Sequence, residues 1–156
     1  MTNKILIIAC ALLCLVGCKD KKDEPNNLIG HVEKPNWEAV ADYDLTSSMT
    51  AVVQVDLSLS FTQEQLQSAK YQPSQDDILA VFAENECLGV GVKDGDLWHI
   101  YIAPSTRFTP TSLVLRYYSA SLKNLFTGDK LITYQNDTQL GTMDNPYQPT
   151  FVISQL

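Results

Sequence analysis

The sequence predicts an all-β protein with the fold of an antiparallel β-sandwich, either immunoglobulin-like or jelly-roll. Apolar and polar residues alternate with a period of two from residue 49 to residue 57, the pattern of a half-buried strand. Residues 78–83 form a continuous apolar run, which is typical of a central strand covered on both faces. Turn residues separate about seven to eight such short strands at regular spacing, as in a sandwich.

Turn chemistry marks where the strands end. Glu84-Asn85-Glu86 interrupts two apolar runs and predicts a tight hairpin. Lys93-Asp94-Gly95-Asp96 predicts the next turn, in which Gly95 is suited to a positive φ. We therefore expect strands at residues 49–57, 78–83, 87–92, 97–103, 112–120, 130–135 and 150–154.

One short helix is predicted over Gln63–Ala69. Thr62 can cap its first turn, and Gln65, three residues later, completes a capping box. Phe61 and Leu66 are spaced as the two members of a hydrophobic staple.

The amino terminus has the pattern of a lipoprotein signal peptide. Lys4 precedes an apolar run at residues 5–17, which is shorter than the roughly 20 residues that a membrane-spanning helix needs. The run ends in Leu15-Val16-Gly17-Cys18, which resembles the lipobox of bacterial lipoproteins. The resemblance implies cleavage before Cys18 and acylation of that residue, and two or more acyl chains hold a soluble domain durably. The alternative is an ordinary or uncleaved signal with a coincidental cysteine.

Residues 18–35 are expected to be the lipidated Cys18 followed by a disordered tether, with residues 36–156 forming the β-sandwich domain. Residues 19–27 are charged, turn-prone and nearly free of apolar side chains, so they cannot bury enough surface to become ordered. This run also resembles the export signal that routes lipoproteins of Bacteroidota to the cell surface, although a simple solvated spacer explains it equally well. Lys19, rather than Asp, follows Cys18, so the family analogy signals no retention in the inner membrane.

Charge and cysteine content limit the function further. The formal net charge is −7, and removal of Lys4 with residues 1–17 would lower it by one, to −8. Because no basic stripe is present, nucleic acid is not an expected partner. Cys10 and Cys14 would leave with the signal peptide and Cys18 would carry lipid, so Cys87 would have no partner for an intrachain disulfide.

Few residues could perform catalysis. His31 and His99 are the only imidazoles, and His31 lies in the expected tether. His99 is placed in the middle of a strand, on the same face as Leu97 and Tyr101, where a structural role is the usual one. Cys87, in an apolar strand, is expected to be a buried, inert thiol. We therefore expect no catalytic residue, no cofactor and no enzymatic activity.

Metal binding is also not expected. Asp94, Asp96, Asp137 and Asp144 could offer oxygen ligands from loops, but they lack the spacing of a twelve-residue calcium loop. Aspartate in turns is explained by hydrogen bonds to its own backbone.

Aromatic residues are the strongest candidates for ligand binding. Trp98, Tyr101, Tyr117, Tyr118 and Tyr134 fall in three predicted strands. Those that face solvent in one register would form a flat platform for a sugar ring or a partner protein, whereas the alternative is that most fill the core. Tyr117 and Tyr118 must point to opposite faces. The candidate ligand-binding residues are Trp98, Tyr101 and Tyr118.

Several short segments resemble a β-sandwich domain that is common in secreted proteins of Bacteroidota. The segments are Asp76-Asp77-Ile78-Leu79-Ala80-Val81-Phe82, Glu86-Cys87-Leu88-Gly89-Val90, Leu115-Arg116-Tyr117-Tyr118-Ser119-Ala120 and Gly141-Thr142-Met143-Asp144-Asn145-Pro146. Leu88 stands where that family usually has Arg. The resemblance implies an exported, non-enzymatic β-domain and supplies no ligand.

Together these observations predict a lipoprotein of the outer membrane, which could face the cell surface. We expect a non-catalytic binding or assembly module for a protein or a glycan. One alternative is a structural accessory subunit of an outer-membrane complex. Another is a glycan-active enzyme that uses carboxylates alone.

Overall fold

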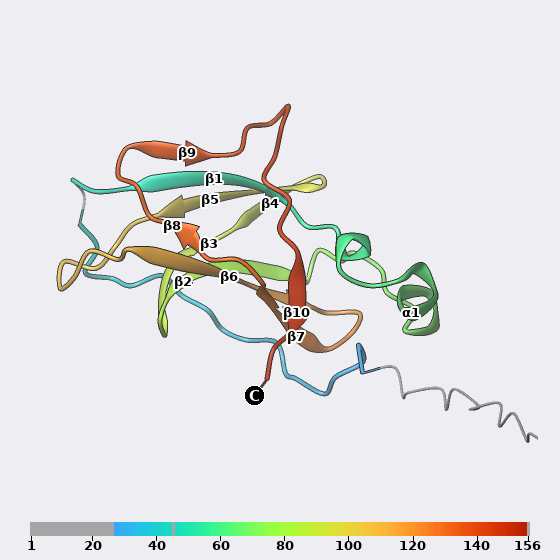
Figure 1. Cartoon of the computed structure of the whole chain (residues 1–156). Coiled ribbons are helices and arrows are strands. Elements are labelled where there is room, and N and C mark those ends of the chain that lie inside the picture. Colours follow the sequence, from blue (N-terminus) through green and yellow to red (C-terminus); the bar gives the residue numbers. More distant parts are fainter. Residues whose placement is uncertain (1–26, 45, 156) are drawn as a thin grey trace, which may run out of the picture.

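The computed structural model describes residues 27–44 and 46–155, and its strands form two facing sheets (Figure 1). The strands are β1 (Met49–Gln54), β2 (Ile78–Ala83), β3 (Glu86–Val90), β4 (Val92–Asp94), β5 (Leu97–Ile102), β6 (Ser112–Ser119), β7 (Asn124–Gly128), β8 (Ile132–Thr133), β9 (Thr138–Leu140) and β10 (Phe151–Ile153). One sheet has the order β4-β5-β1-β9, and the other has the order β10-β7-β6-β2-β3, with β8 paired to β6. The predicted all-β sandwich is confirmed.

The strand pairs are antiparallel except for β1 and β9, which run parallel. Parallel pairing requires a long connection between the two strands, and here most of the domain separates them. The predicted antiparallel sandwich therefore has one parallel strand pair, at this edge of the first sheet.

Three short strands were not predicted, and one predicted strand is much shorter than expected. One of the three is β4, which includes Lys93 and Asp94 of the predicted turn. β7 and β9 lack an extended apolar alternation. In the predicted strand at residues 130–135, only β8 pairs with a neighbour. β9 lies at the edge of the first sheet, whereas β7 lies between β10 and β6 but buries only one apolar side chain, Phe126. Strands that bury so few apolar side chains have a weak sequence pattern.

The core lies between the sheets and follows the period of two. Alternate residues of the central strands are buried in one apolar cluster: Ala51 and Val53 of β1, Leu79 and Val81 of β2, Trp98, Ile100 and Ile102 of β5, and Leu113, Leu115 and Tyr117 of β6. β2 is covered on both faces, as predicted, because Ala80 and Phe82 are also buried, on its outer side. Among the described residues, no helix is long and apolar enough to cross a bilayer.

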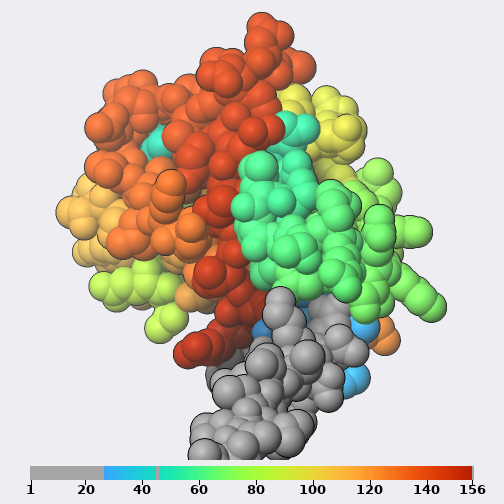
Figure 2. Space-filling model, turned by 45° about the vertical axis from the view of Figure 1, so that its right-hand side comes forward, coloured from blue at the N-terminus to red at the C-terminus, as the bar shows by residue number. Residues whose placement is uncertain are grey.

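The predicted helix is confirmed as α1 (Gln63–Ser68), preceded by the 3-10 helix η1 (Leu57–Leu59). The capping box of α1 is complete. The Gln65 backbone amide donates to the Thr62 hydroxyl (3.2 Å), and the Thr62 backbone amide donates to the Gln65 side chain (2.9 Å). Phe61 and Leu66 both pack into the main core. Figure 2 shows this part of the chain, in green, beside the red carboxy-terminal segment, and the Phe151 amide donates to the Ser60 hydroxyl there (2.7 Å).

Residues 28–44 form a strap along the outside of the second sheet, so the expected tether boundary at residue 35 is wrong. Leu28 is fully buried in the main core. The amides of Gly30 and Val32 donate to the carbonyls of Leu122 and Lys123 at the turn between β6 and β7 (both 2.9 Å). The remainder of the expected tether, like residues 1–17 and Cys18, lies outside the described residues.

The strap also closes the outer face of the second sheet. The Trp37 ring packs edge-on against Phe82, with ring centroids 5.4 Å apart, and the Arg116 guanidinium lies 4.2 Å from the centroid of the same phenyl ring. The Val40 amide donates to the Cys87 carbonyl (2.9 Å), which occupies the free edge of β3. The domain therefore already includes residue 28, rather than starting at residue 36.

Two glycines permit close approaches that a side chain would block. At Gly89 of β3, an added Cβ would lie 2.3 Å from the Tyr101 carbonyl oxygen of β5. This close approach lies just before the chain passes from the second sheet to the first, between β3 and β4. Gly141 has a φ of 71°, and an added Cβ would lie 2.5 Å from both the Val52 carbonyl oxygen and the Tyr147 nitrogen. Glycine at these positions is required by the backbone.

Truncation of Leu28 tests the revised boundary. Because the side chain is fully buried, Leu28→Ala should lower the free energy of unfolding by about 2–5 kcal/mol. The neighbouring Ile29 is 52% exposed, so Ile29→Ala is the matched control, with an expected change within about 0.5 kcal/mol. Chemical denaturation measures both, and equal small effects would contradict a packed strap.

Candidate functional site

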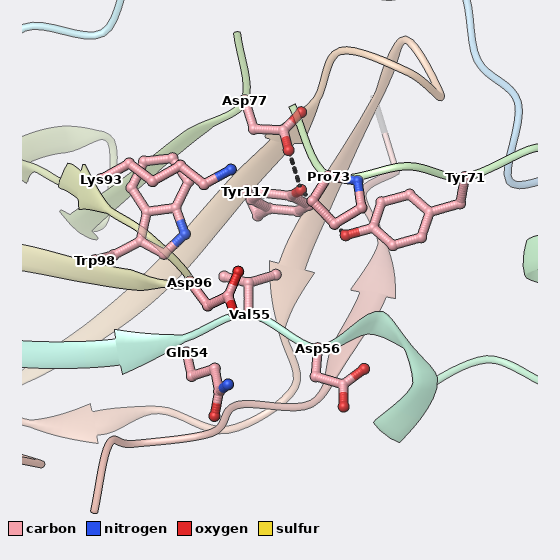
Figure 3. Close-up of a pocket in the computed structure, with 10 residues that line it drawn as sticks. All are labelled: Gln54, Val55, Asp56, Tyr71, Pro73, Asp77, Lys93, Asp96, Trp98 and Tyr117. Carbon is pink, nitrogen blue, oxygen red and sulfur yellow. Dashed lines mark hydrogen bonds between the residues drawn. The ribbon is translucent and has the colours of Figure 1, made fainter. Parts of the chain in front are cut away.

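A polar cavity opens at one end of the sandwich, where both sheets contribute side chains (Figure 3). Its volume is about 130 Å³. The walls come from the end of β1, the loop between α1 and β2, the β4–β5 hairpin and β6; they are Gln54, Val55, Asp56, Tyr71, Pro73, Asp77, Lys93, Asp96, Trp98 and Tyr117. We call this the polar cavity.

The buried carboxylate of Asp77 forms the inner wall. Its Oδ2 atom accepts the Ser74 amide (2.7 Å) and the Tyr117 hydroxyl (2.8 Å), and its Oδ1 atom accepts the Ala120 amide (2.8 Å). Figure 3 shows the bond between Asp77 and Tyr117. Three donors satisfy this carboxylate, which joins the start of β2 to the end of β6.

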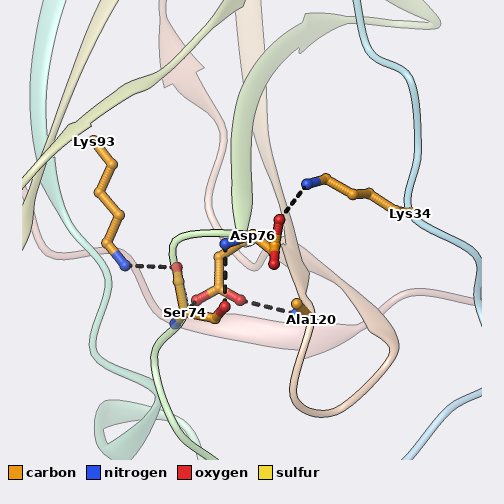
Figure 4. Close-up of polar contacts among 6 residues, drawn as sticks. Lys34, Ser74, Asp76, Lys93 and Ala120 are labelled. Atoms are coloured by element: carbon orange, nitrogen blue, oxygen red, sulfur yellow. Dashed lines mark hydrogen bonds and ion pairs between the residues drawn. The ribbon is translucent and has the colours of Figure 1, made fainter.

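The loop before β2 is also tied to the strap and to β4. The Lys34 ammonium pairs with Asp76 at 2.9 Å and holds the pKa of that carboxyl below its usual value. The Lys93 ammonium donates to the Ser74 carbonyl (2.8 Å). Figure 4 shows these two lysines reaching the same loop from opposite sides.

Two tyrosine hydroxyls line the cavity and are coupled to Asp77. The Tyr117 hydroxyl lies 3.4 Å from that of Tyr71. Because Tyr117 donates its proton to Asp77, Tyr71 is the donor in this contact. Burial raises the pKa of both phenols, and the negative charge of Asp77 adds to the effect. Both phenols are therefore neutral and act as hydrogen-bonding groups.

The outer part of the cavity carries polar groups that do not use all of their hydrogen-bonding capacity within the protein. The Lys93 ammonium lies 5.6 Å from the centroid of the Trp98 ring system. Figure 3 shows the indole nitrogen of Trp98 directed into the cavity, towards Asp96. Within residues 27–44 and 46–155, neither that N–H nor the Asp96 carboxylate has a hydrogen-bond partner. Asp56 accepts the Ser58 amide through Oδ1 (2.9 Å).

A second candidate surface is an apolar groove between the strap and the first sheet. Its volume is about 430 Å³, and its lining residues are Ala39, Val40, Ala41, Tyr43, Leu88, Tyr101 and Ala103. Tyr43 is 45% exposed and Tyr101 is 52% exposed. We call this the tyrosine groove.

The three candidate ligand-binding residues from the sequence do not form one platform. Trp98 is buried, with one edge on the polar cavity. Tyr101 is exposed in the tyrosine groove. Tyr118 is buried on the outer side of the second sheet, where its hydroxyl donates to the Val32 carbonyl of the strap (3.4 Å). Trp98 and Tyr101 lie on opposite faces of β5, so these three residues do not share one stacking surface.

The remaining aromatic residues in those strands are core residues, in agreement with the alternative interpretation that most of the set fills the core. Tyr117 and Tyr134 are buried in the main cluster, and the Tyr134 hydroxyl bonds to that of Ser47 (2.7 Å).

The histidines and the cysteine lie apart from one another. His99 is on the outer face of the first sheet, opposite Val52 of β1 and Val92 of β4. His31 is exposed on the strap, although its neighbours Gly30 and Val32 are fixed by hydrogen bonds. Cys87 is 8% exposed, and burial raises the pKa of its thiol, which is consistent with an inert residue.

Among the described residues, no group of three or more His, Cys, Asp or Glu side chains is arranged to hold a metal ion. Asp94, Asp96, Asp137 and Asp144 are therefore not brought together as a ligand set. The carboxylates that do share a cavity are those of Asp56, Asp77 and Asp96. Of these, Asp77 is committed to the fold by its three donors.

Sequence reasoning missed Lys93 and Tyr43 as surface-forming residues. The sequence pattern places Lys93 only in a turn, and Tyr43 lies outside every predicted strand. No local pattern identifies either one, because each meets its neighbours only after the strap and the β4–β5 hairpin are folded. The quoted motifs do contain one signal, since Asp77 of the first segment bonds to Tyr117 and Ala120 of the third.

Comparison of the chain with protein-family models, with curated proteins and with solved structures finds no match in any of the three.

The buried phenols predict a loss of stability in alkali. An unfolded tyrosine ionises near 10.0, whereas the pKa values of Tyr71, Tyr117 and Tyr147 are raised in the folded protein. Their stabilising effect is thus complete below about pH 10 and falls as pH rises towards the folded-state pKa values. For the deeply buried Tyr117 the fall is about 1.4 kcal/mol per pH unit, and it is smaller for Tyr147, which is half-buried.

Tyr117→Phe should make this slope shallower. It should also cost roughly 1–3 kcal/mol at neutral pH, because Asp77 loses a donor. Tyr101→Phe, at an exposed position, serves as the control. Denaturation curves and tyrosinate absorbance across the alkaline range give both quantities, and an unchanged slope in Tyr117→Phe would refute the assignment.

Proposed function

We propose that this protein is a lipoprotein of the bacterial outer membrane, held by lipid on Cys18, and that its β-sandwich is a non-catalytic module that binds a partner protein. The observation that carries the binding role is the tyrosine groove, with two exposed aromatic rings at an apolar hollow. The resemblance of several segments to a secreted domain of Bacteroidota supports the location.

The chemistry of the groove favours a protein over a sugar. Its walls are small or aliphatic side chains, and tyrosine hydroxyls are the only polar side-chain groups among them. A sugar needs several polar partners, whereas an apolar side chain of a partner protein needs none. Exposed tyrosines are typical anchors at protein interfaces.

Charged side chains beside the groove indicate which kind of residue should lie next to the apolar side chain of the partner protein. Glu38 and Asp42 belong to the strap segment that forms the groove, and Asp42 pairs with Arg107 at 3.1 Å. Arg107 also lies 3.5 Å from Glu86, so one cation is shared between two carboxylates. This acidic rim suits a partner segment with a basic residue next to an apolar one.

The groove predicts a specific crosslink. A photoreactive phenylalanine analogue at Tyr101, introduced in intact cells, should crosslink to one major partner, while the same analogue at Leu131 should not. Leu131 is the control because it is 71% exposed and lies outside the groove. Equal crosslinking at the two positions would contradict the proposal.

The partner that is identified should then bind the purified domain through the two tyrosines. Tyr43→Ala and Tyr101→Ala should each weaken the Kd about tenfold or more, as expected for interface anchors, and Leu131→Ala should not change it. Isothermal titration gives the affinities, and unchanged affinity in both tyrosine variants would exclude this groove.

Lipid attachment is tested separately. Cys18→Ala should move the protein from the membrane fraction to the soluble fraction and abolish labelling with palmitate, because two or more acyl chains provide the anchor. A variant that remains in membranes with unchanged labelling would rule out the anchor. Cys87→Ala, at a buried thiol, is the control and should leave the fractionation unaltered.

A further inference from the structure

We propose that the polar cavity binds one sugar residue through its hydroxyl groups, with Trp98, Lys93, Asp96 and Asp56 as the hydrogen-bonding residues. This site is separate from the tyrosine groove, and the inference stands or falls independently of the protein-binding role.

The first observation is the unpaired indole N–H of Trp98. The residue is only 4% exposed, and its nitrogen is directed into the cavity (Figure 3). Within the part of the chain that the structure describes, this N–H has no acceptor, and its nitrogen is open to the cavity rather than buried. It is therefore free to donate to an acceptor of a ligand that enters the cavity.

The second observation is that the same cavity also presents acceptors. Asp96 has no partner among the described residues, and one oxygen of Asp56 is without a protein donor there. The ligand must donate to these carboxylates while it accepts from Trp98 and Lys93. A hydroxyl group does both, so adjacent hydroxyls of a sugar fit this mixed lining.

Charge argues against the two simpler ligand classes. An anion would meet the carboxylates of Asp56, Asp77 and Asp96 with only Lys93 to compensate. A cation would compete with Lys93, whose ammonium already lies at the Trp98 ring and on the Ser74 carbonyl. A neutral polyhydroxylated ligand avoids both conflicts.

The size and rigidity of the cavity define how much of a glycan enters. At about 130 Å³, it is below the roughly 300–1,000 Å³ of pockets for drug-sized ligands. It therefore accommodates the edge of one ring, such as the terminal residue of a glycan. The inner wall is already built, because Asp77, Tyr117 and Tyr71 are joined by hydrogen bonds before any ligand arrives.

Trp98 also provides the means to test the site. The chain has two tryptophans, so Trp37→Phe leaves Trp98 as the single tryptophan, which can be excited selectively at wavelengths that tyrosine does not absorb. In this protein, titration with glucose, galactose, mannose or N-acetylglucosamine should change the Trp98 emission in a saturable way for at least one of them. Ethylene glycol, which has two hydroxyls but no ring, is the solvent control and should give no saturation.

Asp96→Asn in the same background should weaken the binding at least fivefold. Asp94→Asn is the matched control, since it makes the same change two residues away, at an exposed position that does not line the cavity. Thermal unfolding verifies that both variants fold. The proposal is overturned if no sugar gives a saturable change, or if Asp96→Asn binds as well as Asp94→Asn.

Discussion

The buried carboxylate of Asp77 is the constraint on which this end of the sandwich depends. It lies at the start of β2 and accepts hydrogen bonds from the preceding loop, from the Tyr117 hydroxyl and from the backbone after β6. A buried charge is tolerated only when donors surround it, so the loop and both strand ends must be in place together. The same arrangement forms the inner wall of the polar cavity. Fold and candidate site therefore share one set of hydrogen bonds.

The central strands could be predicted because each buries a full row of alternate side chains. β2 and β5 begin where the alternation and the turns place them, and the capping box of α1 is visible in four consecutive residues. The strap could not be predicted. Its only fully buried apolar residue is Leu28, directly after a charged run, and its order comes from hydrogen bonds to the distant turn between β6 and β7. Such contacts leave no local period in the sequence.

The candidate sites were accessible to sequence reasoning only in part. Tyr101 was selected, and the structure exposes it. The sequence predicts that Trp98 stacks on a ligand through the face of its ring. In the structure, the part of Trp98 that reaches the cavity is the ring edge that carries the nitrogen. Tyr118 was equally plausible from the alternation, but the strap covers it. Which face of a sheet remains free is decided by segments outside the sheet, and a strand pattern alone carries no information about them.

The strap also limits how far the domain can stand from a bilayer. Leu28 is fixed in the core, so ten residue steps separate it from Cys18 in the anchored chain. At about 3.6 Å per step, this allows a separation of roughly 36 Å, against about 65 Å if the fixed part began at residue 36. With the lipid attachment proposed above, the turn between β6 and β7 is kept near the lipid headgroups. Lateral diffusion in the plane of the membrane, rather than free reach into the surrounding space, would then govern which molecules the domain meets.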